Sequence, residues 1–492
     1  MQTNYQKLSD HHQEVSLLSS ASSTLGWDQE TFLPAKGVEF RAKQLSYFSG
    51  KIHEMTTNSA YRNLLENAEA ENGNNTTESA NLREWRHSFD QSNKLPQALV
   101  EESSQASSLG MAAWTEAREK NDFSLFAPNL AQLVDIAKKK ADLWGYDDEP
   151  YDALLGCYER GAKTSDVARI FDAFQPKITD IARLAVEKSA ATPARKLEGD
   201  FPIEKQMLLN QEVAESIGFD FEGGRIDTTT HPFCTTLGPA DIRLTTRYYK
   251  HDFTASLFGV MHEAGHGLYE QGLPSSDYAY PSGNAISLGI HESQSLLWEA
   301  HVGRSRGFWN KWFPRVQELF PQMQSWNVDE FLHTINSANY SQIRVDADEA
   351  TYDLHILLRF GIEREILNGN IAINDIPAAW NERFESLFGI CPDSDAKGCL
   401  QDVHWSMGGL GYFPTYTLGN LNASQLFHAA TQDAGIKSAF DGADYAPLLQ
   451  WMRENIHAHG STYHPQELMQ RASGEPTNPD HHLAHLKRRF LS

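Results

Sequence analysis

The chain has 492 residues, of which 40% are hydrophobic, so it can bury a large core as two domains or as one helical body. Its net charge of −23 is spread over the whole length without a basic stripe, which argues against nucleic acid or an anionic membrane as a partner. Its amino terminus is polar, its four cysteines are scattered, and no apolar run reaches membrane-spanning length. We therefore expect a cytoplasmic protein with reduced cysteines.

Helix is the element that the sequence predicts along most of the chain. In residues 38–52, for example, apolar residues recur at helical spacing. The exception is 225–249, where β-branched residues lie on either side of a Gly-Pro turn at 238–239, and this pattern predicts a small β-ribbon. Directly after the ribbon, Asp252 or Thr254 can cap the next helix.

This next helix, "SLFGVMHEAGHGLYEQG" (256–272), contains His262, Glu263 and His266 in the spacing H-E-x-x-H. Residues four apart lie on one face of a helix, so both histidines can point at one ion with Glu263 beside it. The alternative is a helix that contains two histidines by chance. The largely apolar surroundings oppose it, because a buried histidine or glutamate needs a partner, and a metal ion supplies one.

A catalytic zinc ion takes three protein ligands and leaves one position for water, so two histidines require a third residue. Glu292 is the candidate, because it lies near the start of the following predicted helix, after a loop long enough to turn the chain back. The spacing leaves Glu299, Glu270 and His291 open as alternatives. A zinc site of this kind predicts amide hydrolysis, with Glu263 as the base that takes a proton from water.

Seven further segments, in this order along the chain, resemble the zinc metallocarboxypeptidases of the thermostable carboxypeptidase Taq family. They are GWDQET at 26–31, HPF at 231–233, DIRLT at 241–245, HEAGH at 262–266, HESQ at 291–294, IRVDAD at 343–348 and GCLQDVHW at 398–405. The resemblance implies a mainly α fold similar to the neurolysin group, with a deep groove, a small β-sheet at the groove wall and a homodimer. It also implies that Glu292 is the third metal ligand.

A carboxypeptidase must bind the free carboxylate of its substrate, and the planar fork of an arginine does so with two hydrogen bonds. The resemblance gives this role to Arg344. The alternative is an internal salt bridge from Arg344 to one of the acids that follow it in "IRVDADE". Arg243, on the predicted ribbon, is expected to be structural.

Three further residues are candidates for substrate binding. Tyr416 lies in the glycine-rich stretch 408–420, which we expect to be a mobile loop, and the resemblance favours its hydroxyl as a donor to the developing oxyanion. His404 and His231 are expected to hydrogen-bond the substrate, and Asp402 to orient a histidine. For each of these residues the alternative is an ordinary packed or hydrogen-bonded side chain.

The sequence thus predicts one domain over 1–492 and a zinc enzyme that releases single amino acids from peptide carboxyl ends with broad specificity. Cobalt or another divalent metal is expected to replace zinc in vitro. The alternatives are a dipeptidyl carboxypeptidase or oligopeptidase on the same scaffold, and a non-catalytic peptide-binding zinc protein. The domain is expected to comprise a helical scaffold (about 1–220), the active-site motifs (about 225–420) and a C-terminal helical part (421–492).

Overall fold

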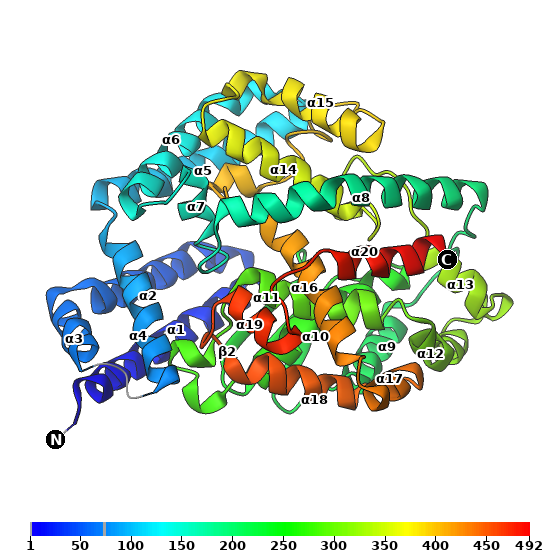
Figure 1. The fold of residues 1–492 in the computed structure, drawn as a ribbon, viewed down its shortest axis with the longest axis horizontal. Helices are drawn as coiled ribbons and strands as arrows, with labels where there is room; N and C mark the ends of the chain where they lie inside the picture. The colour runs from blue at the N-terminus through cyan, green and yellow to red at the C-terminus, as the bar shows by residue number, and fades with distance from the viewer. Residues whose placement is uncertain (1, 72–74) are drawn as a thin grey trace. The chain divides into compact units, whose positions relative to one another are not determined.

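The computed structural model describes residues 2–71 and 75–492, and helices make up most of this part of the chain (Figure 1). The strands within it form one three-stranded sheet. The predicted mainly α fold with a small sheet is therefore confirmed. No helix within the same residues is both long and apolar enough to cross a membrane.

The chain forms two compact units and passes through each of them three times. The first unit contains Met1–Ser92, Arg195–Leu332 and Leu426–Pro476, and the second contains Asn93–Ala194, His333–Gln425 and Thr477–Ser492. Each unit therefore draws on all three parts into which the sequence was divided. A single domain over 1–492 stays a prediction.

The first unit carries the sheet and most of the shorter helices. Its elements are α1 (Asn4–Thr31), α2 (Val38–Thr57), α3 (Ser59–Ala70), α4 (Thr76–Asn93), α9 (Ile203–Ser216), β1 (Gly224–Thr228), β2 (Cys234–Gly238), β3 (Asp241–Thr246), α10 (Phe253–Gly272), α11 (Leu288–Leu296), α12 (Arg306–Leu319), α17 (Ala434–Asp441), α18 (Ala446–Asn455) and α19 (Pro465–Ser473). The predicted helix at 38–52 lies within α2.

The second unit is helical and has a large apolar core. Its elements are α5 (Gln97–Lys120), α6 (Ala127–Trp144), α7 (Pro150–Leu155), α8 (Thr164–Ala191), α14 (Tyr352–Leu367), α15 (Ile376–Phe388) and α20 (Asp480–Leu486). Helices α13 (Val328–Ile335) and α16 (Pro414–Ala430) each have residues in both units, as does α4 through its last residue, Asn93. The core is built from α6, α8, α14 and α15, and α20 packs against α8.

The sheet has the strand order β1-β3-β2. The antiparallel pair β2 and β3 surrounds the Gly-Pro turn and confirms the predicted ribbon, which its β-branched residues favour. The third strand, β1, pairs with β3 in parallel, which the turn pattern alone did not predict. Helix α10 packs on β3 and β2 and joins the sheet after a short connection.

The start of α10 is fixed by Asp252, whose side chain accepts hydrogen bonds from the backbone N–H groups of Thr254 and Ala255. Of the two predicted caps, Asp252 is therefore the one used. Ser287 caps α11 in the same way, by accepting from the N–H of Ile290. Both helices of the predicted metal site thus begin at a residue that the sequence specifies locally.

Candidate metal centre

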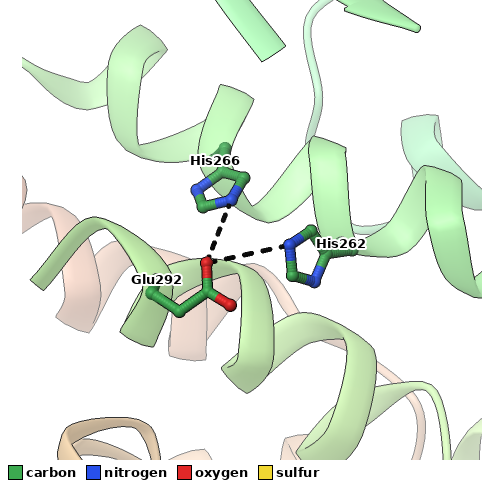
Figure 2. A group of neighbouring side chains, drawn as sticks. All are labelled: His262, His266 and Glu292. Carbon is green, nitrogen blue, oxygen red and sulfur yellow. Dashed lines mark ion pairs between the residues drawn. The ribbon is translucent and has the colours of Figure 1, made fainter. Parts of the chain in front are cut away.

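Helices α10 and α11 bring His262, His266 and Glu292 together (Figure 2). The two imidazole rings stand 4.9 Å apart at 83° on one face of α10. Oε2 of Glu292 lies 3.8 Å from Nε2 of His262 and 3.5 Å from Nε2 of His266. In the part of the chain that the structure describes, these three residues form the one group of histidine, cysteine or acidic side chains with ligand atoms all within 4.8 Å of one another.

The close approach of the two helices depends on Gly265, the fourth residue of the HEAGH segment. A Cβ atom at this position would lie 2.6 Å from the carbonyl oxygen of Gln294 and 2.6 Å from Cα of Ser295. Any larger residue would push α11, and Glu292 with it, away from the histidines. The glycine is therefore required by the packing of the two helices.

The alternative ligands lie behind the histidines. Oε2 of Glu299 is 3.0 Å from Nδ1 of His262, and the carbonyl oxygen of His291 is 3.1 Å from Nδ1 of His266. The ring of His291 in turn contacts Glu270, with 2.8 Å between Nε2 and Oε1. Because both Nδ1 atoms have protein partners, the Nε2 atoms are the ones directed at Glu292.

The charges of these groups favour a bound cation. Burial acts to lower the pKa of His262, but Glu292 and Glu299 outweigh burial and raise it to about 10. Burial acts to raise the pKa of Glu292, but the two histidines outweigh it and lower the value to about 2. Glu292 and Glu299 thus place two carboxylates around the imidazoles. Two histidines plus one carboxylate are ligands that suit zinc.

Glu263 is buried beside His262, with 7% of its surface exposed. Burial is the main cause that raises its pKa to about 7, with His262 acting in the opposite direction. A carboxylate with a pKa near neutrality both accepts and releases a proton under physiological conditions. This environment is why Glu263 stays the candidate for the general base.

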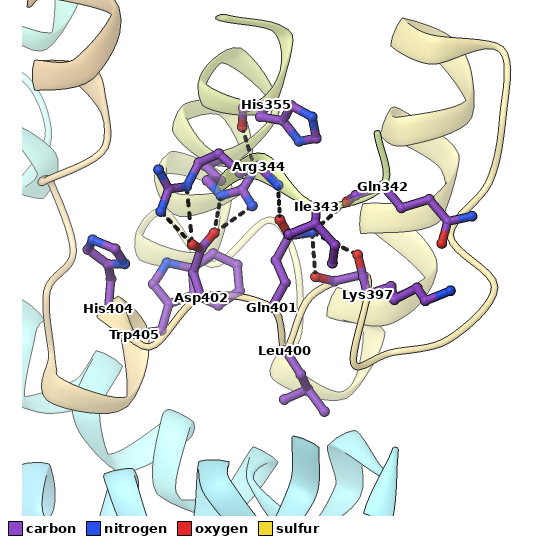
Figure 3. Close-up of polar contacts among 12 residues, drawn as sticks. Gln342, Ile343, Arg344, His355, Lys397, Leu400, Gln401, Asp402, His404 and Trp405 are labelled. Carbon is purple, nitrogen blue, oxygen red and sulfur yellow. Dashed lines mark hydrogen bonds and ion pairs between the residues drawn. The ribbon is translucent and has the colours of Figure 1, made fainter. Parts of the chain in front are cut away.

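The second unit holds Arg344, whose guanidinium contacts Asp402 (Figure 3). Nε and Nη2 of Arg344 donate to Oδ1 of Asp402 at 3.1 and 2.8 Å, and Nη1 donates to the hydroxyl of Tyr352 at 2.8 Å. The internal salt bridge considered as the alternative thus exists, but its acid comes 58 residues later, not from the segment that follows Arg344. Asp402 also accepts from Nε of Arg359 at 2.8 Å.

Asp402 therefore serves two arginines, and its hydrogen bonds with side chains go to them. Burial acts to raise the pKa of Asp402, but Arg359 and Arg344 outweigh it and hold the value well below its usual range. We expected Asp402 to orient a histidine, but the side chains that it orients by hydrogen bonds are those of Arg344 and Arg359. Two guanidinium groups around one carboxylate leave this cluster with an excess of one positive charge.

Tyr416 and His404 lie beside the arginine cluster. The hydroxyl of Tyr416 is 3.5 Å from Nε2 of His404, and the guanidinium of Arg344 is 5.0 Å from the centre of the Tyr416 ring. Burial lowers the pKa of His404 to about 4, so its imidazole is neutral near pH 7. The expected mobile loop at 408–420 is wrong in its second half, because α16 begins at Pro414 and places Tyr416 in a helical turn.

Two other predicted residues lie in the first unit. His231 is exposed between β1 and β2. Arg243 on β3 forms two hydrogen bonds with Asp241, at 2.7 and 2.8 Å, and its guanidinium stacks 4.1 Å from the centre of the Trp27 ring. Arg243 thus connects the DIRLT and GWDQET segments, which agrees with the structural role expected for it.

Sequence reasoning missed Arg359 and considered Glu299 only as a ligand. Arg359 stands alone in the apolar run "LHILLRF" on α14, and a single charge in such a run needs a buried partner. Glu299 follows Glu292 by seven residues, two helical turns, and so lies on the same face. Both signals were present in the sequence.

Comparison with known proteins agrees with this geometry. The family model described as carboxypeptidase Taq (M32) metallopeptidase matches residues 7–490. The chain belongs to this family. It is 37% identical to thermostable carboxypeptidase 1 of Thermus thermophilus over 99% of this chain and 98% of that protein. It is 34% identical to carboxypeptidase 1 of Bacillus subtilis, over 97% and 96% of the two chains.

Solved structures of the same family have the same fold. The M32 carboxypeptidase of Deinococcus radiodurans superimposes with a TM-score of 0.96 at 36% identity, covering 99% of both chains. Metallocarboxypeptidase 1 of Trypanosoma cruzi gives a TM-score of 0.95 at 35% identity, also over 99% of each chain. The chain is therefore a metallopeptidase of the carboxypeptidase Taq family, with a divalent metal as its cofactor.

Proposed function

We propose that this metallocarboxypeptidase uses zinc to hydrolyse the last peptide bond of its substrates and to release single amino acids with broad specificity. The observation that carries the proposal is the convergence of His262, His266 and Glu292 beside the buried carboxylate of Glu263. Cobalt or another divalent ion is expected to replace zinc in vitro, since affinity alone does not select the metal.

The residues have separate roles in this reaction. His262, His266 and Glu292 would hold the divalent metal, which when bound would supply a Lewis acid for the substrate carbonyl and for a water molecule. Glu263 accepts the proton of the attacking water and passes it to the leaving amine, which its pKa near neutrality favours. Burial of Glu263 also keeps bulk water away from this proton transfer.

Substrate recognition requires a cation for the terminal carboxylate, and we propose Arg344 for this role. Its cluster has an excess of positive charge, which supports binding of an anion. Tyr416 is proposed to donate its hydroxyl to the oxyanion, with His404 and His231 as further hydrogen-bonding residues. Recognition of the free carboxylate by a fixed guanidinium would restrict the enzyme to peptide ends.

A pair of peptides tests the proposal. The enzyme is loaded with zinc and incubated with one peptide and with its C-terminally amidated twin, and the products are read by mass. We expect a ladder of single-residue losses from the free acid and little cleavage of the amide. Release of dipeptides would support the dipeptidyl carboxypeptidase alternative, and internal fragments from both peptides would support an oligopeptidase.

The third alternative, a peptide-binding protein with a structural zinc, is not favoured. Structural zinc sites usually have four protein ligands, and this group has three, with the buried carboxylate of Glu263 beside it. A homodimer stays part of the proposal and is tested by measuring the mass of the protein in solution.

A further inference from the structure

The two metal-binding histidines are held from behind in different ways. Nδ1 of His266 faces the backbone carbonyl and the ring of His291, whereas Nδ1 of His262 faces the carboxylate of Glu299. A carboxylate is a stronger acceptor than a neutral carbonyl because it is charged. The support behind His262 is therefore the stronger of the two.

We propose that Glu299 is a positioning residue of the metal centre, which fixes the orientation and the tautomer of His262 through the hydrogen bond to Nδ1. With the Nδ1 proton held by Glu299, His262 keeps Nε2 for a metal ion on the side of Glu292. A carboxylate behind a metal-binding histidine also makes the imidazole a better electron donor. This inference rests on the proposed function, because it assumes that His262 binds the metal.

The backbone around Glu299 is built for this contact. Residues Leu297–Val302, which directly follow α11, form a π-helical turn, and such turns are frequent at functional sites. Gly303 directly follows this turn, and a Cβ atom at Gly303 would lie 2.6 Å from the sulfur of Met261 on α10. The π-helical turn is thus packed closely against the turn of α10 that carries His262.

Glu299 is held in place by a second contact. Nη2 of Arg304 lies 3.5 Å from Oε1 of Glu299, and the guanidinium of Arg304 stacks 4.2 Å from the centre of the Phe258 ring. Phe258 precedes His262 by four residues on α10, so it lies on the same face of that helix. Arg304 therefore ties the carboxylate to the same helix whose histidine it supports.

The test compares the zinc affinity of Glu299 variants with that of the wild type, measured by competition with a chromogenic chelator. We expect Glu299→Ala to bind zinc about 10- to 100-fold more weakly, and Glu299→Gln to lie between it and the wild type. The matched control is Glu84→Gln, which removes another buried carboxylate of the first unit that is paired with an arginine, Arg83, at 2.6 Å. This control should bind zinc as the wild type does.

Two further readouts separate positioning from general stability. The metal-free Glu299→Gln protein should remain folded at the temperature of the assay, while the visible absorption spectrum of its cobalt form should change because the histidine is oriented differently. Zinc affinity and a cobalt spectrum equal to those of the wild type in both Glu299 variants would overturn the inference. If the wild-type protein itself bound no divalent metal, the proposed function would fail, and the inference with it.

Discussion

The metal centre of the first unit and the arginine cluster of the second are both buried groups of charged side chains, but their charges are balanced differently. Around His262 and His266 the carboxylates exceed the positive charges that the chain provides, and the Nε2 atoms converge on one of them. Around Asp402 two guanidinium groups share one carboxylate. The first site thus favours a cation, whereas the excess of positive charge at the second is the reason why we propose Arg344 for the substrate carboxylate.

The comparison also shows how sequence distance affects prediction. The candidate metal ligands come from two consecutive helices, and two of them lie one helical turn apart. Arg344 and Asp402 are 58 residues apart and meet only through the tertiary fold. Each prediction below changes a residue of one unit at a time.

The largest effect is expected at Glu263. Glu263→Gln keeps the size of the side chain but cannot accept a proton from water, so kcat should fall by about 100- to 10,000-fold. Zinc content, measured by mass spectrometry of the metal, should stay at the wild-type level, because Glu263 is not a ligand. Full activity at full zinc content would remove the role of general base from this residue.

The next effect is expected at Arg344. Loss of a bidentate contact with the substrate carboxylate should lower kcat/KM for a free-acid peptide by about 30- to 1,000-fold in Arg344→Ala, and discrimination against the amidated peptide should be lost with it. The zinc content should not change.

Arg243→Ala is the control for Arg344, since its guanidinium is paired with Asp241 and stacked on Trp27. This variant should lose stability and keep the preference for the free acid. An Arg344→Ala enzyme with wild-type discrimination would transfer the recognition of the carboxylate to another cation.

A smaller effect, on stability, is expected at Gly265. The added methyl group of Gly265→Ala meets the backbone of α11 at 2.6 Å, which should destabilise the fold by about 2–3 kcal/mol and weaken zinc binding as Glu292 moves away. The control is Gly259→Ala on the same helix, where the nearest atom is a threonine hydroxyl at 3.4 Å. Urea unfolding of both variants checks this expectation. Equal stabilities of the two variants would show that α11 can move away from α10 without a loss of unfolding free energy.

The smallest effect is expected at Glu363, in the second unit. This buried carboxylate accepts from the hydroxyl of Tyr151, the indole of Trp405 and the N–H of Gly411. Burial is the main cause that raises its pKa from 4.5 to about 7, while the three hydrogen bonds act to lower it. The folded protein therefore holds a proton there that the unfolded chain releases at lower pH.

Between pH 4.5 and about 7 the folded state binds more protons than the unfolded chain. The contribution of Glu363 to the free energy of unfolding therefore falls as the pH rises through this range and stays constant at higher pH. Relative to Glu363→Gln, the wild type should lose about 2 kcal/mol of stability between pH 5.5 and 7.5. Urea unfolding at both pH values measures this difference. A constant difference between the two proteins would mean that Glu363 keeps the same protonation state in the folded and unfolded chain.

The parts of the site that sequence predicts are those with local causes. A few neighbouring residues set the cap at Asp252 and the i, i+4 spacing of the two histidines. The β2–β3 ribbon likewise depends on neighbouring residues. The carboxylate partner of Arg344 could not be predicted, since no spacing rule joins residues from separate segments. The start of α16 at Pro414 was hidden because the glycines that precede it are typical of a loop.

The most direct test of the metal centre is the zinc content of Glu292→Ala after purification and dialysis. Two histidines hold zinc too weakly without the third ligand, so we predict a folded protein with little bound zinc and no peptidase activity. Glu299→Ala, treated in the same way, should lose affinity but keep measurable zinc. Full zinc content in Glu292→Ala together with its loss in Glu299→Ala would contradict the proposed site and make Glu299 the ligand.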